Sequence, residues 1–218
     1  MVTFQDVARN EVLRQYVVKA NRVLQALGYT EHGERHVTLV ARIAHALLTH
    51  LDHPQREAEL AAIAGFLHDV GNMLGREGHG QSSALLVAPI LRQMGMPEHE
   101  LTEVLMAIAN HEDEAGSVIS NISAALILAD KSDVHRSRVQ NPNPETFDIH
   151  DRVNYSVTSS FLRVLPKERE LVLELKLEED TSVMDYFEIF IQRMLMCRKA
   201  AEHLGQRFVL SINDQRLL

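Results

Sequence analysis

The first part of the chain carries apolar residues at helical spacing. Between residues 4 and 27 the positions on this stripe are Val7, Leu13, Val17 and Leu24. Gly28 is placed to end the helix, because glycine readily adopts the left-handed conformation that closes many helices. We therefore predict one N-terminal helix within residues 1–28.

The same spacing continues to about residue 135 and predicts further helices. Their predicted ranges are 34–51, 54–67, 82–94, 97–111 and 118–135. Ser82 and Ser83 can cap the helix at 82–94, and Pro89 should kink or split it. Pro97 is a favourable first-turn residue for the helix that follows.

The pattern changes after Asn141-Pro142-Asn143-Pro144, which favours an irregular connection. Residues 153–165 and 171–177 have the character of two strands joined by a polar turn, and leucine at every second position of 171–177 predicts one buried face. Thr181 or Ser182 can cap a long helix that ends at Gly205. Residues 208–212 complete a strand-strand-helix-strand unit.

These patterns predict a mainly α protein with a small C-terminal α+β appendage. The expected organisation is a helical domain over residues 1–140, a linker over 141–152 and a small subdomain over 153–218. Two roles are open to the subdomain. It forms a homodimer through its sheet edge, or it shapes the pocket of the helical domain.

Composition excludes several classes of function. Among 218 residues, 22 Lys and Arg stand against 30 Asp and Glu, so the net charge is −8. Long-range attraction to nucleic acid polymers or anionic membranes is therefore not expected. The longest apolar run, 124–129, is too short to span a bilayer, and the single cysteine, Cys197, fits a reducing compartment. We expect a cytoplasmic protein.

Histidine and aspartate residues occupy several apolar stripes. His36 begins the stripe of its helix, His111 closes another, and Asp130 continues a third at helical spacing, so all three should face the core. A single inward histidine is more often a hydrogen-bonded core residue than a metal ligand. An isolated buried carboxylate, however, costs several kcal/mol unless a cation or hydrogen bonds compensate it.

The neighbouring residues His68 and Asp69 strengthen this pattern. Adjacent side chains on a helix point about 100° apart, whereas a helix end can direct both to one ion, and Gly71 is placed to supply that end. His79, in the loop ahead of the next helix, can reach the same centre. Several inward imidazoles and two inward carboxylates are hard to satisfy with protein partners alone, which makes metal coordination the simplest explanation.

The order of these residues resembles the HD-domain superfamily of metal-dependent phosphohydrolases. The resemblance covers about residues 34–138 and rests on the phrases Leu67-His68-Asp69-Val70-Gly71 and Leu128-Ala129-Asp130-Lys131. It implies a helical core with one metal ion bound by His36, His68, Asp69 and Asp130. In branches with two extra histidines, which this chain has, Asp69 bridges to a second ion held by His79 and His111.

The resemblance implies hydrolysis of a phosphomonoester or phosphodiester, with His68 and Asp69 as catalytic residues. The expected substrate is a nucleotide or a related small metabolite. The mixed ligands suit divalent Fe or Mn, which we favour, and also Zn, Ni or Co. Two ions about 4 Å apart can hold a bridging hydroxide and stabilise charge on the attacking and leaving oxygens.

Lys131, Arg136 and Arg138 follow the last predicted ligand and are basic residues that can bind phosphate; we expect Lys131 and Arg136 to bind the substrate. A simpler explanation for the two arginines is a solvated helix end with favourable basic charge. Relatives that cleave cyclic dinucleotides often carry Lys where this chain has Asn72. They also show a paired His and a Gly-Tyr-Pro phrase, whereas residues 110–117 of this chain are Asn-His-Glu-Asp-Glu-Ala-Gly-Ser. Specificity for cyclic dinucleotides is therefore not implied.

Two other functions remain open. A few relatives use the same cage with mixed-valent iron to activate oxygen, so a dinuclear-iron oxygenase is one alternative. The other is a regulatory module that senses a nucleotide without turnover. Such modules often lose ligands, and this chain has lost none, so we rank it last.

Overall fold

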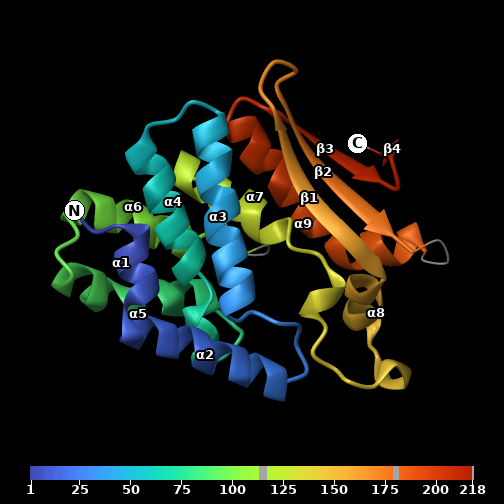
Figure 1. Ribbon diagram of the computed structural model, residues 1–218, viewed down its shortest axis with the longest axis horizontal. Helices are drawn as coiled ribbons and strands as arrows, with labels where there is room; N and C mark the ends of the chain where they lie inside the picture. Colours follow the sequence, from blue (N-terminus) through green and yellow to red (C-terminus); the bar gives the residue numbers. More distant parts are fainter. Residues whose placement is uncertain (113–116, 179–181, 218) are drawn as a thin grey trace.

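The computed structural model describes residues 1–112, 117–178 and 182–217. A body of helices lies on one side and a small sheet on the other, which confirms the predicted fold class (Figure 1). In the described residues the α-helices are α1 (Phe4–Arg9), α2 (Glu11–Ala26), α3 (Glu34–His50), α4 (Gln55–Leu67), α5 (His79–Gln93), α6 (Glu98–Ala109), α7 (Asn121–Lys131), α8 (Ile149–Ser156) and α9 (Val183–His203). The strands are β1 (Val157–Leu165), β2 (Glu170–Leu177), β3 (Arg207–Ile212) and β4 (Gln215–Arg216).

The N-terminal segment forms two helices instead of the single one predicted. Asn10 separates α1 from α2 with an extended ψ of 117°, and its side chain accepts hydrogen bonds from the N–H groups of Val12 and Leu13. An asparagine that caps the following helix competes with helix continuation, which explains the break. Gly28 follows the end of α2 with a φ of 83°, in the left-handed region as predicted.

Helices α3 and α4 lie side by side at the centre of the helical body (Figure 1). Gly65 allows their close approach, because a Cβ at this position would lie 2.9 Å from the backbone of Ala41. The two helices run antiparallel, so the first turns of α3 and the last turn of α4 meet at one end. This arrangement brings His36 next to His68, whose Nε2 atoms are 3.4 Å apart.

Helix α5 starts earlier than predicted. It begins at His79, after Gly78 in the left-handed conformation with a φ of 62°, so Ser82 and Ser83 lie inside the helix and do not cap it. The helix also runs through Pro89 without splitting. The early start places His79 in the first helical turn, close to the end of α4.

Helices α6 and α7 are shorter than predicted. Pro97 directly precedes α6, which ends before His111. Ser120 caps α7 by accepting a hydrogen bond from the N–H of Ser123, 3.2 Å away. Because α7 ends at Lys131, His135 lies beyond it.

Residues 149–156 form helix α8, where we predicted the end of a linker and the start of a strand. Asp148 caps α8 by accepting a hydrogen bond from the N–H of Asp151, 2.8 Å away. The cap and the burial of Val153, which is 1% exposed, outweigh the strand propensity of this segment. Before α8, Pro144 begins only a short 3-10 helix, in keeping with the irregular connection predicted there.

The sheet has the strand order β1-β2-β3-β4. Strands β1 and β2 form the predicted antiparallel hairpin, with Leu162 opposite Leu173. Strand β3 returns through α9 and runs parallel to β2, with Leu210 beside Leu173, and the short β4 was not predicted. The leucines of β2 are buried as expected. Ser182 precedes α9 without a side-chain cap, and Thr181 lies outside the described residues.

Apolar side chains of α9 and of the sheet belong to the same buried cluster as those of the helices before residue 140. The two predicted parts thus share one hydrophobic core, and their division into separate domains stays a prediction. None of the helices in the described part of the chain combines the length and the apolar character needed to cross a membrane.

Candidate metal centre

His68 and Asp69 lie where α4 ends and a 3-10 helix, Val70–Met73, begins. His68 keeps helical backbone angles, whereas Asp69 departs from them with a ψ of −1°. The two side chains therefore converge, and Oδ2 of Asp69 lies 3.2 Å from Nε2 of His68. A helix end does bring both side chains to one place, as the sequence led us to expect.

Gly71 has a different role from the one predicted. It is not in the left-handed region and so does not close α4 in the expected way. A Cβ at Gly71 would lie 2.1 Å from the carbonyl oxygen of His79 and 2.5 Å from the nitrogen of Ser83. The N–H of Gly71 donates to Oγ of Ser83, and Ser83 donates to the carbonyl oxygen of His68. The missing side chain thus lets the start of α5 pack against the His68-Asp69 pair.

Four of the predicted ligands meet at a first centre. Nε2 of His36 lies 3.3 Å from Oδ1 of Asp130 and 3.5 Å from Oδ2 of Asp69. Nε2 of His68 lies 3.5 Å from the same Asp130 oxygen. Ligand atoms about 2.1 Å from a tetrahedral ion are roughly 3.4 Å from one another. The ligand atoms of His36, His68 and Asp130 are close enough to share one ion, and Oδ2 of Asp69 lies beside both histidines.

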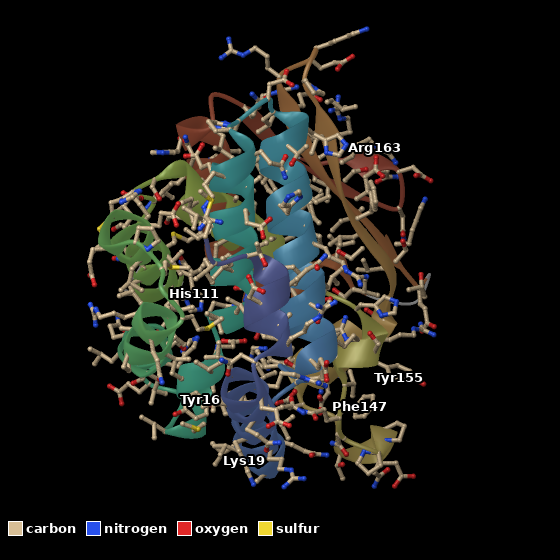
Figure 2. The ribbon with its side chains drawn as sticks, turned by 60° about the vertical axis from the view of Figure 1, so that its left-hand side comes forward. Tyr16, Lys19, His111, Phe147, Tyr155 and Arg163 are labelled. Carbon is tan, nitrogen blue, oxygen red and sulfur yellow. The ribbon has the colours of Figure 1, made fainter. Side chains whose placement is uncertain are left out.

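The other carboxylate oxygen of Asp69 faces a second centre. Oδ1 of Asp69 lies 3.2 Å from Nε2 of His79, and that nitrogen lies 3.2 Å from Nε2 of His111. The two centres adjoin, because the rings of His68 and His111 are 4.9 Å apart. His111 lies beside the helices of the bundle, away from the sheet (Figure 2). Asp69 therefore directs one oxygen to each centre.

Each of the four histidines has its other ring nitrogen engaged. Nδ1 of His36 lies 2.7 Å from Oδ2 of Asp133. In the other three, Nδ1 lies 2.6 to 3.0 Å from a backbone carbonyl oxygen: His68 to Gly65, His79 to Arg76 and His111 to Ile108. Because these oxygens only accept, Nδ1 carries the hydrogen and Nε2 faces the centre. A bound metal ion would accept the lone pair of each Nε2 in place of a proton.

The electrostatics of the cluster also favour a cation. Burial opposes ionisation of Asp69, yet His68 and the other imidazoles hold its pKa well below the usual value. The pKa of Asp130 is likewise lowered against burial, chiefly by Lys131. Although burial alone would lower it, these two carboxylates raise the pKa of His68 to about 10. Oδ2 of Asp69 is buried and has no hydrogen-bond partner among the described residues, so a cation would compensate its charge. The donor set therefore fits divalent transition metals.

Two buried residues that the sequence patterns did not identify orient the ligands. Asp133 accepts from His36 and from Nη2 of Arg35, at 2.7 Å in both cases. Asn72 donates to Oδ1 of Asp69 at 2.9 Å and accepts from Arg76 at 3.1 Å. The only signal for Asp133 was its position three residues after Asp130. Asn72 stood out in the sequence only as a departure from relatives that cleave cyclic dinucleotides, not as a partner of Asp69.

A cavity of about 770 Å³ opens over the two centres. Four basic side chains line it together with the predicted ligands Asp69, His79, His111 and Asp130; they are Arg76, Lys131, Arg138 and Arg193. His32 and Glu112, which the sequence patterns did not single out, also line it. Burial, aided by the charge of Arg138, holds the pKa of His32 well below its usual value, so His32 is neutral. Residues 113–116 lie outside the described part of the chain.

Of the two residues predicted to bind substrate, Lys131 lines the cavity and Arg136 does not. Nζ of Lys131 donates to the carbonyl oxygen of His111 at 3.0 Å and lies 3.3 Å from Oδ2 of Asp130. Arg136 begins a 3-10 helix beyond α7, which turns it toward Glu178, 2.5 Å away, and over the ring of Tyr155. The prediction for Arg136 therefore finds no support.

Comparison with known proteins agrees with this geometry. Residues 33–136 match the family model of the HD domain. This match identifies residues 33–136 as an HD domain. The matched segment includes every predicted ligand, from His36 to Asp130, and HD domains are typically metal-dependent hydrolases. Arg138 and Arg193, which line the same cavity, lie outside the HD domain.

The chain is also similar to an uncharacterized protein, MJ1020, of Methanocaldococcus jannaschii. The two are 26% identical over 171 residues. The match covers 67% of this chain and 65% of MJ1020. The chain therefore spans about two thirds of the length of this relative.

Proposed function

We propose that the protein is a metal-dependent phosphohydrolase that uses two divalent ions. The observation that carries this proposal is the position of Asp69, which directs Oδ2 to His36 and His68 and Oδ1 to His79. A shared carboxylate between two sets of ligands is the arrangement expected of a dinuclear site. Bound ions would lower the pKa of a water molecule and neutralise charge on a phosphate.

The distances between these side chains support the following ligand assignment. His36, His68, Asp69 and Asp130 would hold one ion, and Asp69, His79 and His111 the other. Imidazole and carboxylate ligands suit Fe or Mn, which we favour, and also Zn, Ni or Co. Asp133 and Asn72 would keep His36 and Asp69 in position, as hydrogen-bonded neighbours of metal ligands commonly do.

The cavity supports a phosphate-bearing substrate. The chain as a whole carries a net charge of −8, so an anionic substrate must be attracted locally. Lys131 is buried beside Asp130 and is suited to bind and orient the reacting phosphate. A cavity of about 770 Å³ lies in the range of small-molecule sites, roughly 300–1,000 Å³, and so suits a nucleotide or a related metabolite.

The experiment is a hydrolysis assay on metal-defined protein. The purified chain is stripped of metal, loaded with Mn²⁺ or Fe²⁺, and tested on phosphomonoesters and phosphodiesters of nucleotides and other small metabolites. We expect release of phosphate or nucleoside monophosphate, and loss of that release in Asp69→Asn. The matched control is Asp52→Asn, because Asp52 is exposed with a φ of 58°, a conformation that asparagine tolerates.

The same experiment separates the alternatives. Release that persists in the Asp69 variant would overturn the proposal. Two bound irons with oxygen uptake and no phosphate release would favour the oxygenase. Tight nucleotide binding without turnover under every metal would favour the sensing module.

A further inference from the structure

Helix α9 contributes a basic side chain to the cavity over the metal centre. Arg193 lines this cavity together with Asp69 and Asp130, although it lies far beyond residue 136, where the HD domain ends. The guanidinium of Arg193 lies 4.7 Å from the centre of the Phe190 ring. Phe190 is 1% exposed, so it provides a fixed surface that holds the arginine in place.

Arg138 lines the same cavity, and hydrogen bonds to the backbone hold its side chain. Its side chain donates to the carbonyl oxygen of Glu31 through Nε and Nη2, and to that of Asp133 through Nη1 at 2.9 Å. Arg138 is 2% exposed. These bonds use three of its five N–H groups, which leaves two for a ligand.

Arg138 and Arg193 line the same cavity. Burial lowers the pKa of Arg138, the Asp133 carboxylate opposes this shift, and the positive charge of Arg193 lowers the pKa further. An anion in the cavity would accept charge-assisted hydrogen bonds from guanidinium groups that line it. The Asp133 carboxylate, 3.7 Å from Nε of Arg138, is already bonded to His36 and Arg35.

Lys131 is positioned for a different part of the substrate. Its Nζ lies 3.3 Å from Asp130, one of the predicted metal ligands, whereas Arg138 is bonded to Glu31 and to the backbone of Asp133. Lys131 therefore lies at the metal centre, whereas Arg138 and Arg193 line the cavity from outside the HD domain.

We propose that Arg138 and Arg193 form a second anion subsite, which selects substrates that carry a second phosphate group besides the one that reacts. The inference rests on the proposed function for the position of the first phosphate. It assigns the C-terminal part of the chain a role in specificity, because Arg193 reaches the cavity from α9. A nucleoside diphosphate or a sugar bisphosphate has the required chemistry.

Binding of unreactive probes to the Mn²⁺-loaded full chain tests this proposal. Calorimetry compares ethane, propane and butane bisphosphonates with the alkyl monophosphonates of the same length. We expect wild type to prefer at least one bisphosphonate. Arg193→Gln should weaken binding of that probe by roughly 10- to 100-fold, the effect of losing a charge-assisted hydrogen-bonded pair, and should leave monophosphonate binding unchanged.

Two further variants keep the result interpretable. Arg198→Gln is the matched control, because Arg198 is exposed on the same helix and does not line the cavity; its probe preference should equal that of wild type. Arg193→Lys keeps the charge without the planar fork, and should lose part of the preference. Thermal unfolding of each variant shows whether it is folded.

The outcomes separate this proposal from the proposed function. The probes are not hydrolysed, so their binding is measured whether or not a substrate has been found. A wild-type protein that shows no preference for any bisphosphonate overturns the second subsite, even if it hydrolyses phosphoesters. Equal weakening of both probe classes in a folded Arg193→Gln variant also overturns it. A preference that only Arg193 variants lose supports the subsite, even if hydrolysis is never observed.

Discussion

Replacing Asp133 by asparagine tests how the first centre is held. Asp133 is 2% exposed and accepts from Nδ1 of His36 and from both terminal nitrogens of Arg35, at 2.7 Å, 2.7 Å and 3.2 Å respectively. It also lies 3.7 Å from Nε of Arg138. Asparagine has almost the same shape but no charge, and its NH2 group cannot accept a hydrogen bond.

Two losses are expected from this substitution. Breaking a buried ion pair costs about 3–5 kcal/mol. The side chain of Arg35 is 36% exposed and Arg138 keeps its carbonyl partners, so we expect the unfolding free energy to fall by less than a fully buried pair would give, about 2–3 kcal/mol. Separately, His36 would lose a charged hydrogen-bond partner, which should weaken binding of Mn²⁺ by roughly 10- to 100-fold.

The assay measures Mn²⁺ affinity by competition with a fluorescent chelator, and unfolding free energy by urea titration of the metal-free protein. The matched control is Asp151→Asn. Asp151 is also buried, at 5% exposure, but burial raises its pKa, so removal of its charge should leave stability equal or slightly higher. Unchanged Mn²⁺ affinity in a folded Asp133→Asn variant would refute the role of Asp133 in orienting His36.

The stability difference at Asp133 should also depend on pH. Burial would raise its pKa, but the hydrogen bond from His36 and the charges of Arg138 and Arg35 hold it well below the usual value. A carboxyl with a lowered folded pKa stabilises the fold above its unfolded pKa, about 3.9, and loses this contribution as the pH falls toward the folded pKa. The gap between wild type and Asp133→Asn should therefore be constant near neutral pH and narrow below about pH 4.

Three further changes test other parts of the molecule. His79→Ala removes a ligand of the second centre, so the Mn²⁺-loaded protein should lose one of two ions by elemental analysis; an unchanged metal content would contradict the dinuclear arrangement. Gly71→Ala would place a Cβ 2.1 Å from the carbonyl oxygen of His79, and we expect a loss of about 3 kcal/mol in urea unfolding; full stability would show that α5 can shift. Glu100→Gln breaks the pair with Arg56, 2.5 Å apart. The hydrogen bond from Arg56 lowers the pKa of Glu100, so the variant should lose about 1 kcal/mol of unfolding free energy at neutral pH and nothing in acid. Melting temperatures at the two pH values measure this difference, and a loss that persists in acid would argue against the ion pair.

Most of the helical architecture follows from local patterns. The predicted helices at 34–51 and 54–67 appear as Glu34–His50 and Gln55–Leu67, because their apolar stripes are long and uninterrupted. The errors lie where one polar side chain decides whether a helix begins. Asn10 caps α2 and so divides the single helix predicted there, and Asp148 caps α8, which the hydrophobic pattern did not reveal.

The candidate ligands could be recognised from sequence for a related reason. A histidine or aspartate on an apolar stripe is an anomaly that one helix already displays, as His36 and Asp130 do. Asp133, which orients His36, lacks such a signal because the two residues are 97 positions apart in sequence. The same holds for Arg193, which reaches the cavity from α9. The dimer predicted through the sheet edge stays a prediction.

The sequence by itself determined the chemistry of this protein: which imidazoles and carboxylates face inward, and that their number calls for a cation. Only the tertiary structure decided the distances between them, with Oδ2 of Asp69 beside His36 and His68 and Oδ1 beside His79. It also brought Lys131, and not Arg136, to the cavity. Helical periodicity sets the direction of a side chain relative to its own axis. It does not set the distance between side chains on different helices, which depends here on close contacts such as Gly65 against Ala41 and Gly71 beneath α5.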